Sequence, residues 1–303
     1  MSLPHCLIIA AITGLSFWLA SCDTGPAEVN TKTDTAKPAP RKKPQQAPNQ
    51  YIPWVLKGND SLEHRFKKSF SPQQLHLIWT INRIDGNHYQ NADTLLVPDV
   101  FVDDLLAYAP FPFKVESLQA IPKIALFDYS IQAYGLYENG YLVKWGATSM
   151  GSRAHPTPTG LFFCNWKGEE VQSTFDDEWI LKWNFNIANK QGIGWHEYAL
   201  PGVPASHSCL RLLAEDARWM YDWAEEWILK DEETELAKGT PVIVFGEYPF
   251  DERKPWLNLL ESPTALQLHE EEIETTVAPF LEEIARQQQK RTEVLNTTQE
   301  QSK

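Results

Sequence analysis

The hydrophobic positions of this 303-residue chain divide it into segments of different character. The first apolar run, CLIIAAITGLSFWLA at 6–20, is continuous but too short to span a bilayer comfortably, and small residues follow it. Residues 23–50 are polar and proline-rich, with almost no large apolar side chains. Such a segment cannot bury enough surface to offset its ordering entropy, so we predict a tether.

Residues 55–98 carry apolar side chains at helical spacing. These positions are Leu62, Phe66, Leu75, Ile78 and Ile81. Ser71 followed by Pro72 is typical of a helix N-cap with proline at the first helical position. TLLVP at 94–98 predicts a short strand that closes this segment.

Between Pro122 and Gly246 the pattern changes to short aromatic and β-branched runs, which predict strands. The first three runs are KIALFDYS, IQAYGLYENG and YLVKWGATS, and a Glu138-Asn139-Gly140 turn separates the last two. GTPVIVFG, which ends at Gly246, predicts a last buried strand.

A helical pattern follows residue 212. The apolar positions that predict this helix are Leu213, Ala217, Tyr221, Ala224 and Ile228. Glu215 and Asp216 near its start suit the positive end of a helix dipole. After Tyr248 the chain is acidic and then rich in Gln and Glu, which predicts a loosely attached helix.

Composition and charge narrow the class of protein. Twelve tryptophans and 21 prolines favour irregular, aromatic-packed β structure over a helical bundle. The formal net charge of −13 excludes nucleic acid as a partner, because its phosphates would be repelled. The same charge is compatible with substrates that carry free amines.

The N-terminal run ends in LASC, which places Cys22 where a bacterial lipobox has its acylated cysteine. Residues 1–21 are then a lipoprotein signal peptide, and multiple acyl chains on Cys22 would hold the protein on a membrane. A plain secretory signal with a chance cysteine is the alternative, since Met1 to His5 contain no Lys or Arg. With Cys6 removed and Cys22 acylated, Cys164 and Cys209 remain for the folded part.

Four roles are open to Cys209 in PASHSCLRL: an inert core thiol, a disulfide partner of Cys164, a metal ligand or a nucleophile. No second CxxC or HxxxH accompanies it, and two cysteines alone show no disulfide framework. A nucleophilic thiolate needs a base or a positive neighbourhood, and His196, His207 and Arg211 supply both. The backbone amides of Ser208 and Cys209 are candidate donors to an oxyanion.

The motif S-H-x-C-L-R-L, the upstream histidine, PTPTGLF and GTPVIVFG together resemble the YkuD-type L,D-transpeptidases of bacterial cell walls. The resemblance covers residues 119–247. It implies a mainly β fold, a β-sandwich or barrel with one or two helices.

The same resemblance implies a role for each residue of the motif. Cys209 would be the catalytic nucleophile, His196 the general base, and His207 a support for substrate and oxyanion. Arg211 would hold the site or a substrate carboxylate. Ser206 matches the hydroxyl residue that opens the motif, and we expect it, like Ser208, at the oxyanion or substrate. Two departures concern substrate access: Ser208 and Glu197 stand where the family usually has glycine.

As a function, the resemblance implies that Cys209 forms a thioester with a peptidoglycan stem peptide and passes it to an amine, with no metal or organic cofactor. Hydrolysis of stems and release of wall-bound protein use the same thioester. A wall-binding lipoprotein with a dead catalytic domain is the non-enzymatic alternative. The upstream segment resembles a degenerate LysM glycan-binding module, the alternative being a helical cap on the main domain.

These interpretations divide the chain into six segments. They also place the protein in the cell envelope, facing the periplasm. The segments are a signal peptide (1–21), a tether (22–50), a small α/β LysM-like module (51–99), a connector (100–118), the catalytic domain (119–247) and an acidic helical tail (248–303).

Overall fold

A computed structural model describes the chain at residues 41–45, 50–58, 62, 65–173 and 179–301. The predicted signal peptide, the lipidation site Cys22 and most of the predicted tether lie outside the described residues. Within the described residues, no helix has both the length and the apolar character needed to cross a bilayer.

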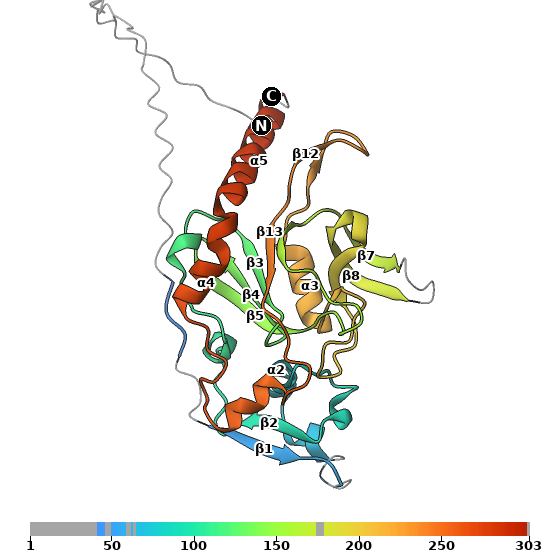
Figure 1. The fold of residues 1–303 in the computed structure, drawn as a ribbon, viewed down its shortest axis with the longest axis vertical. Helices are drawn as coiled ribbons and strands as arrows, with labels where there is room; N and C mark the ends of the chain where they lie inside the picture. Colours follow the sequence, from blue (N-terminus) through green and yellow to red (C-terminus); the bar gives the residue numbers. More distant parts are fainter. Residues whose placement is uncertain (1–40, 46–49, 59–61, 63–64, 174–178, 302–303) are drawn as a thin grey trace, which may run out of the picture. The chain divides into compact units, whose positions relative to one another are not determined.

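Nine strands form one sheet in the order β6-β13-β3-β4-β5-β10-β9-β8-β7 (Figure 1). Their bounds are β3 Ile124–Asp128, β4 Ala133–Glu138, β5 Tyr141–Ser149, β6 Gly160–Phe163, β7 Lys167–Gln172, β8 Ile180–Ala188, β9 Ile193–Glu197, β10 Leu210–Leu212 and β13 Pro241–Phe245. Two neighbouring pairs run parallel, β13 with β3 and β10 with β9, and the others are antiparallel. The prediction of a mainly β fold is confirmed.

The β4–β5 hairpin has the turn that the sequence predicts. Asn139 and Gly140 both have positive φ, 50° and 79°, as a two-residue hairpin turn requires. All five residues of β3 are buried, so both faces of the sheet are covered at its centre.

The helix after β10 is shorter than its apolar pattern suggests. α3 spans Ala214–Trp223, and Ala224 already has extended backbone angles. The predicted continuation to Ile228 is wrong, because backbone groups there bond outside the helix: Glu225 N–H donates to Thr240 Oγ1 and Trp227 N–H to the Asn165 carbonyl. Ile228–Leu229 instead form strand β11, which pairs with β12 at Glu235–Ala237.

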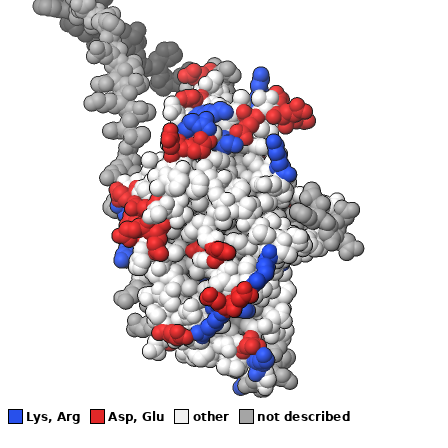
Figure 2. Space-filling model, viewed as in Figure 1, with Lys and Arg blue, Asp and Glu red and all other residues white. Residues whose placement is uncertain are grey.

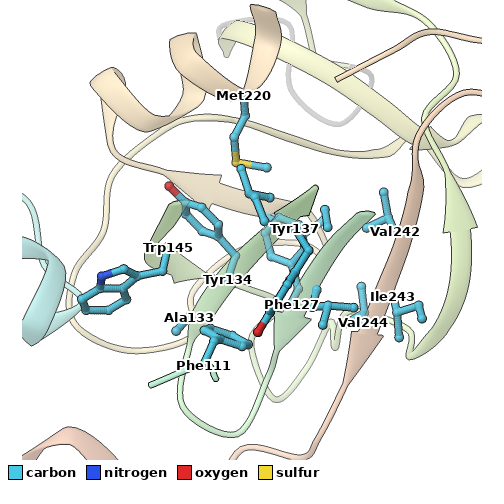
Figure 3. Close-up of a cluster of buried hydrophobic side chains, with 14 of the residues drawn as sticks. Phe111, Phe127, Ala133, Tyr134, Tyr137, Trp145, Met220, Val242, Ile243 and Val244 are labelled. Carbon is cyan, nitrogen blue, oxygen red and sulfur yellow. The ribbon is translucent and has the colours of Figure 1, made fainter. Parts of the chain in front are cut away.

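The core covers both faces of the sheet at its centre, and α3 packs against one of them (Figure 3). Met220 of α3 lies on the same side of the sheet as Tyr134, whereas Tyr137 of β4 points to the other side, toward Phe111, and donates to the Pro112 carbonyl. The side chains of Met220, Tyr134 and Tyr137 are fully buried. Phe111, which precedes the sheet, packs over Gly135, where an added Cβ would lie 2.8 Å from the ring. Burying each such side chain stabilises the fold by roughly 1.5–3 kcal/mol.

The upstream segment consists of β1 (Tyr51–Val55), α2 (Pro72–Asn82) and β2 (Thr94–Pro98), with β1 and β2 antiparallel. Ser71 forms the predicted N-cap in a full capping box with Gln74. The hydrophobic cluster of this segment is completed by three residues of the sheet domain: Ala147, Leu200 and Leu213. The segment therefore packs directly on the sheet domain, while its LysM resemblance stays a prediction.

Arg83 ends α2 in a left-handed conformation (φ 54°), and its side chain is only 1% exposed. Its guanidinium donates to the carbonyls of Thr80, Ile81 and Ile131 at 2.7–3.1 Å. The rings of Trp145 on β5 and Trp256 in the C-terminal segment lie 5.9 Å and 5.6 Å from it. One buried cation thus joins the upstream segment, the sheet and the C-terminal segment.

The C-terminal segment contains α4 (Glu270–Val277) and α5 (Leu281–Gln301). Its first half is not loosely attached as predicted, because Ile273, Val277 and Ile284 are fully buried against the core. The acidic residues stay on the surface, and three of them, Glu270 to Glu272, occupy the first turn of α4. On the face drawn in Figure 2, acidic side chains form patches with basic side chains beside most of them.

We expect Arg83→Met to lower the free energy of unfolding by about 3–5 kcal/mol, because three buried carbonyls lose their donor. The measurement is urea denaturation of the folded domain. Arg253→Met is the control, since Arg253 pairs with Glu261 at the exposed surface, and its loss should cost less than about 1 kcal/mol. Equal effects of the two substitutions would contradict the role of Arg83.

Candidate active site

The site lies where β10 runs parallel to β9, with Arg211 paired to His196 in register. Cys209 directly precedes β10, and its thiol donates to the Gly192 carbonyl at the start of β9, 3.7 Å away. The predicted nucleophile and the predicted base thus lie on neighbouring strands, with Cys209 two residues before the partner of His196.

A pocket of about 70 Å³ opens on this junction. Five of the six residues singled out from the sequence line it: His196, Ser206, His207, Cys209 and Arg211. Apolar side chains from the β7–β8 hairpin and its surroundings, among them Trp166 and Trp179, line the rest. The residues that the sequence motif names therefore converge on one cavity.

His196 is 3% exposed, and its Nδ1 lies 2.9 Å from the Glu197 carbonyl. Because a carbonyl only accepts, Nδ1 carries the proton and Nε2 of the neutral ring is left as a proton acceptor. Burial is the main cause that lowers the pKa of His196 to about 4. The hydrogen bond to Glu197 raises this pKa, whereas the positive charge of Arg211 also lowers it. The imidazole is therefore neutral at pH 7 and available as a base.

Cys209 is a free, partly exposed thiol. Burial raises its pKa above the ordinary value of 9.0, while a backbone hydrogen bond from Gly194 and the charge of Arg211 act in the opposite direction. The resting site therefore holds a protonated thiol beside a neutral imidazole. Proton transfer between them has to accompany substrate binding or attack.

Ser208 adopts φ 81°, the left-handed conformation for which the family's usual glycine is suited. Its hydroxyl points away from the pocket and donates to the Pro156 carbonyl at 3.0 Å. Thr157 Oγ1 donates to the Ser208 carbonyl at 2.9 Å and accepts from Gly151 N–H at 2.8 Å. These bonds hold a strained residue, and they leave Ser208 without a side-chain role in the pocket.

Ser206 is 1% exposed, and its hydroxyl donates to the Cys209 carbonyl at 2.5 Å. The bond closes the turn that carries the thiol, so the serine positions Cys209. Predicted as a substrate or oxyanion contact, Ser206 lines the pocket while its hydroxyl is engaged by the backbone.

Two residues of the site were missed by the sequence interpretation. Tyr198 lies on the same strand face as His196, and its ring stacks under the Arg211 guanidinium at 4.5 Å. Its spacing from His196 could have indicated it. Thr157 belongs to the PTPTGLF motif, and nothing local in the sequence indicates that it supports Ser208.

The remaining histidine of the motif, His207, stacks on His155 at 4.5 Å between ring centroids and lies 5.6 Å from Trp179. His155 is exposed at the rim of the pocket. Cys164 is fully buried and free, so no disulfide joins it to Cys209. Among the described residues, no group of three or more His, Cys, Asp or Glu could hold a metal ion.

Residues 122–244 match the model of the YkuD family, described as the L,D-transpeptidase catalytic domain. The match covers about two fifths of the chain and includes β3 to β10, α3 and most of β13. This part of the chain is therefore similar to the catalytic domain of that family. No protein of curated function matches the chain.

Solved structures with some likeness to the chain include three L,D-transpeptidases. One from Stackebrandtia nassauensis is 23% identical over 42% of this chain and 57% of its own, with a TM-score of 0.35. The catalytic domain from E. faecium is 23% identical over 41% of this chain and 96% of its own (TM-score 0.32). One from Mycobacterium tuberculosis H37Rv is 17% identical over 66% of this chain and 92% of its own (TM-score 0.32).

We expect iodoacetamide to alkylate Cys209 faster than Cys164, because burial raises the pKa of Cys164 well above 9.0 and closes it to reagent. The Cys209 rate should rise up to and beyond pH 9, since burial also raises its pKa. Timed labelling followed by peptide mass spectrometry gives both rates, and Arg211→Gln should slow the Cys209 reaction at neutral pH. A Cys209 rate that is already constant below pH 7 would contradict the neutral resting pair.

The lowered pKa of His196 makes stability depend on pH. At a pH between 6.5, the ordinary pKa of histidine, and about 4, its pKa in the folded chain, the unfolded chain binds a proton at this residue and the folded chain does not. Folding stability should therefore fall by about 2 kcal/mol from pH 7 to pH 5 on account of this residue. Denaturant titrations of the wild type and of His196→Asn at both pH values measure the contribution of His196 to this loss of stability. An equal loss in the two proteins would contradict the lowered pKa of His196.

Proposed function

We propose that this protein is a peptidoglycan L,D-transpeptidase that uses Cys209 as its nucleophile. One observation carries the proposal: Cys209, His196 and Arg211 line a single pocket within the part of the chain that matches the YkuD family. Arg211 is the residue suited to a substrate carboxylate, since its guanidinium is exposed to the pocket and is held flat by Tyr198.

In the first half-reaction, the Cys209 thiol gives its proton to His196 Nε2, and the sulfur attacks the donor carbonyl that precedes the terminal D-alanine. The carbonyl oxygen becomes an oxyanion, for which the backbone N–H groups of Ser208 and Cys209 are the donors. The C–N bond then breaks. The leaving D-alanine amine takes the proton from His196, and the donor stays on Cys209 as a thioester.

In the second half-reaction, an amine of a neighbouring stem attacks the thioester carbonyl. The C–S bond breaks, the amine loses a proton to His196, and that proton returns to the Cys209 sulfur. The products are a cross-linked peptide and the free thiol. Water in place of the amine would give hydrolysis of the donor by the same steps.

We also propose that the protein acts from the cell envelope, anchored by lipid on Cys22. The support is the sequence alone: a short apolar run, the LASC motif and a proline-rich tether. An anchored enzyme on a tether suits a substrate that is an immobile polymer. The upstream segment is proposed to contact glycan only through its LysM resemblance.

The test is incubation of the soluble domain with purified muropeptides, followed by mass spectrometry of the products. The wild type should form cross-linked dimers and release D-alanine, and Cys209→Ala should lower both rates by a factor of roughly 10⁴ or more. Cys164→Ala is the matched control, because it removes a thiol that does not reach the pocket. Cross-linking that survives in Cys209→Ala would refute the proposal.

Intact mass after exposure to a carbapenem separates a live enzyme from a wall-binding protein with a dead domain. The folded wild type should gain one adduct, and Cys209→Ala should gain none. Absence of an adduct on folded wild-type protein would favour the non-enzymatic alternative.

A further inference from the structure

Transfer to an amine requires that a second substrate reach Cys209 while the donor fills the pocket. The donor is expected to occupy the pocket at Cys209, so the acceptor must approach the thioester from the surroundings of that pocket. Two larger hollows in the described part of the chain are candidates for this approach, one of about 320 Å³ and one of about 610 Å³.

The smaller hollow shares Tyr198 with the pocket, but its charged side chains lie on the face of the sheet opposite to His196. Glu197 and Lys182, which face each other across β9 and β8, line it. Successive side chains of a strand point to opposite faces, so Glu197 points away from the face that His196 occupies. A peptide held by Glu197 and Lys182 would therefore lie away from the face that carries His196.

The larger hollow, here named the tail groove, is lined by Tyr129, Arg153, Pro156 and residues 247–252. A single loop separates it from the pocket. The Pro156 carbonyl accepts from Ser208, beside the nucleophile. His155, the neighbour of Pro156, stacks on the pocket residue His207. A ligand in the tail groove therefore needs to pass only the exposed rim at 155–156 to reach Cys209.

The chemistry of the tail groove favours a cationic, partly apolar ligand. Three carboxylates line it, those of Glu247, Asp251 and Glu252, against the one guanidinium of Arg153. Arg153 is already engaged, because it pairs with Asp251 at 2.6 Å and lies 5.0 Å over the Phe250 ring. Glu247 and Glu252 are exposed, so their charges remain available to a ligand.

We propose that the tail groove binds the acceptor, a peptide with a protonated amine, next to the aromatic side chains of Tyr129, Tyr248 and Phe250. The inference rests on the proposed function, because it assigns the second substrate of that reaction. It also gives the segment after Phe245, beyond the YkuD match, a part in the chemistry. An anionic ligand is disfavoured by the surplus of carboxylates.

The groove carboxylates concentrate the ammonium form of the acceptor near the rim. Before attack, the amine gives up one proton, and the neutral nitrogen forms the new C–N bond as the C–S bond of the thioester breaks. The groove changes only the supply of acceptor. Formation of the thioester from the donor does not involve it.

The test separates the two half-reactions in the soluble domain, with a stem tetrapeptide as donor and a stem peptide bearing one free amine as acceptor. The double variant Glu247→Gln/Glu252→Gln should release D-alanine without acceptor at the wild-type rate, within about twofold. Its ratio of transfer to hydrolysis should fall about tenfold, the effect expected from two exposed charge contacts. Glu261→Gln is the control, because it makes the same change on the C-terminal segment outside the groove.

Added salt should lower the wild-type ratio toward that of the double variant, since the attraction acts between exposed charges. An unchanged ratio in the double variant would overturn the tail groove as acceptor site. Loss of binding to amine-free glycan strands, with the ratio unchanged, would also overturn it and point to a sugar. Failure of the wild type to form a thioester with the donor would refute the proposed function itself, a result distinct from these.

Discussion

The structure depends on a buried charge, the guanidinium of Arg83. Burial lowers its pKa only to about 10, so the group stays charged at neutral pH. No carboxylate among the described residues forms a salt bridge with it. Three carbonyls and the faces of Trp145 and Trp256 compensate the charge, and the Asp128 carboxylate also favours it. Since these partners belong to three segments, the charge is stable only when all three are docked.

From that cation a series of hydrogen bonds leads to the nucleophile. Arg83 bonds the carbonyl that precedes Gln132, a fully buried residue in the left-handed conformation. The Gln132 side chain accepts from Met150 N–H, and the Met150 carbonyl accepts from Ser206 N–H. Ser206 in turn holds the Cys209 carbonyl. Because unmade buried hydrogen bonds are costly, this series links the end of α2 to the turn that carries the thiol.

The sequence predicted the local structure correctly where neighbouring residues determine it. The cap at Ser71, the Asn139-Gly140 turn and the strand at 94–98 follow from neighbouring residues, and all were predicted. The helix after β10 was predicted to be too long, because the groups that accept the backbone hydrogen bonds just after its end belong to Asn165 and Thr240, which lie far away in the sequence. Thr157 and Ser208 also lie far apart in the sequence, so the hydrogen bond between them could not be predicted from neighbouring residues.

The electrostatics of the pocket set a condition on the chemistry. Burial lowers the pKa of His196 to about 4 and raises that of Cys209, so moving the proton from sulfur to imidazole in the resting site is unfavourable. Arg211 cannot remove this cost alone, since its charge favours the thiolate but equally opposes an imidazolium. A substrate carboxylate that neutralises Arg211 would relieve that opposition. An oxyanion forming at the backbone N–H groups would draw the negative charge off sulfur as attack proceeds. The proton transfer is therefore best placed within the attack itself, so that the thiol becomes reactive only when a donor is bound.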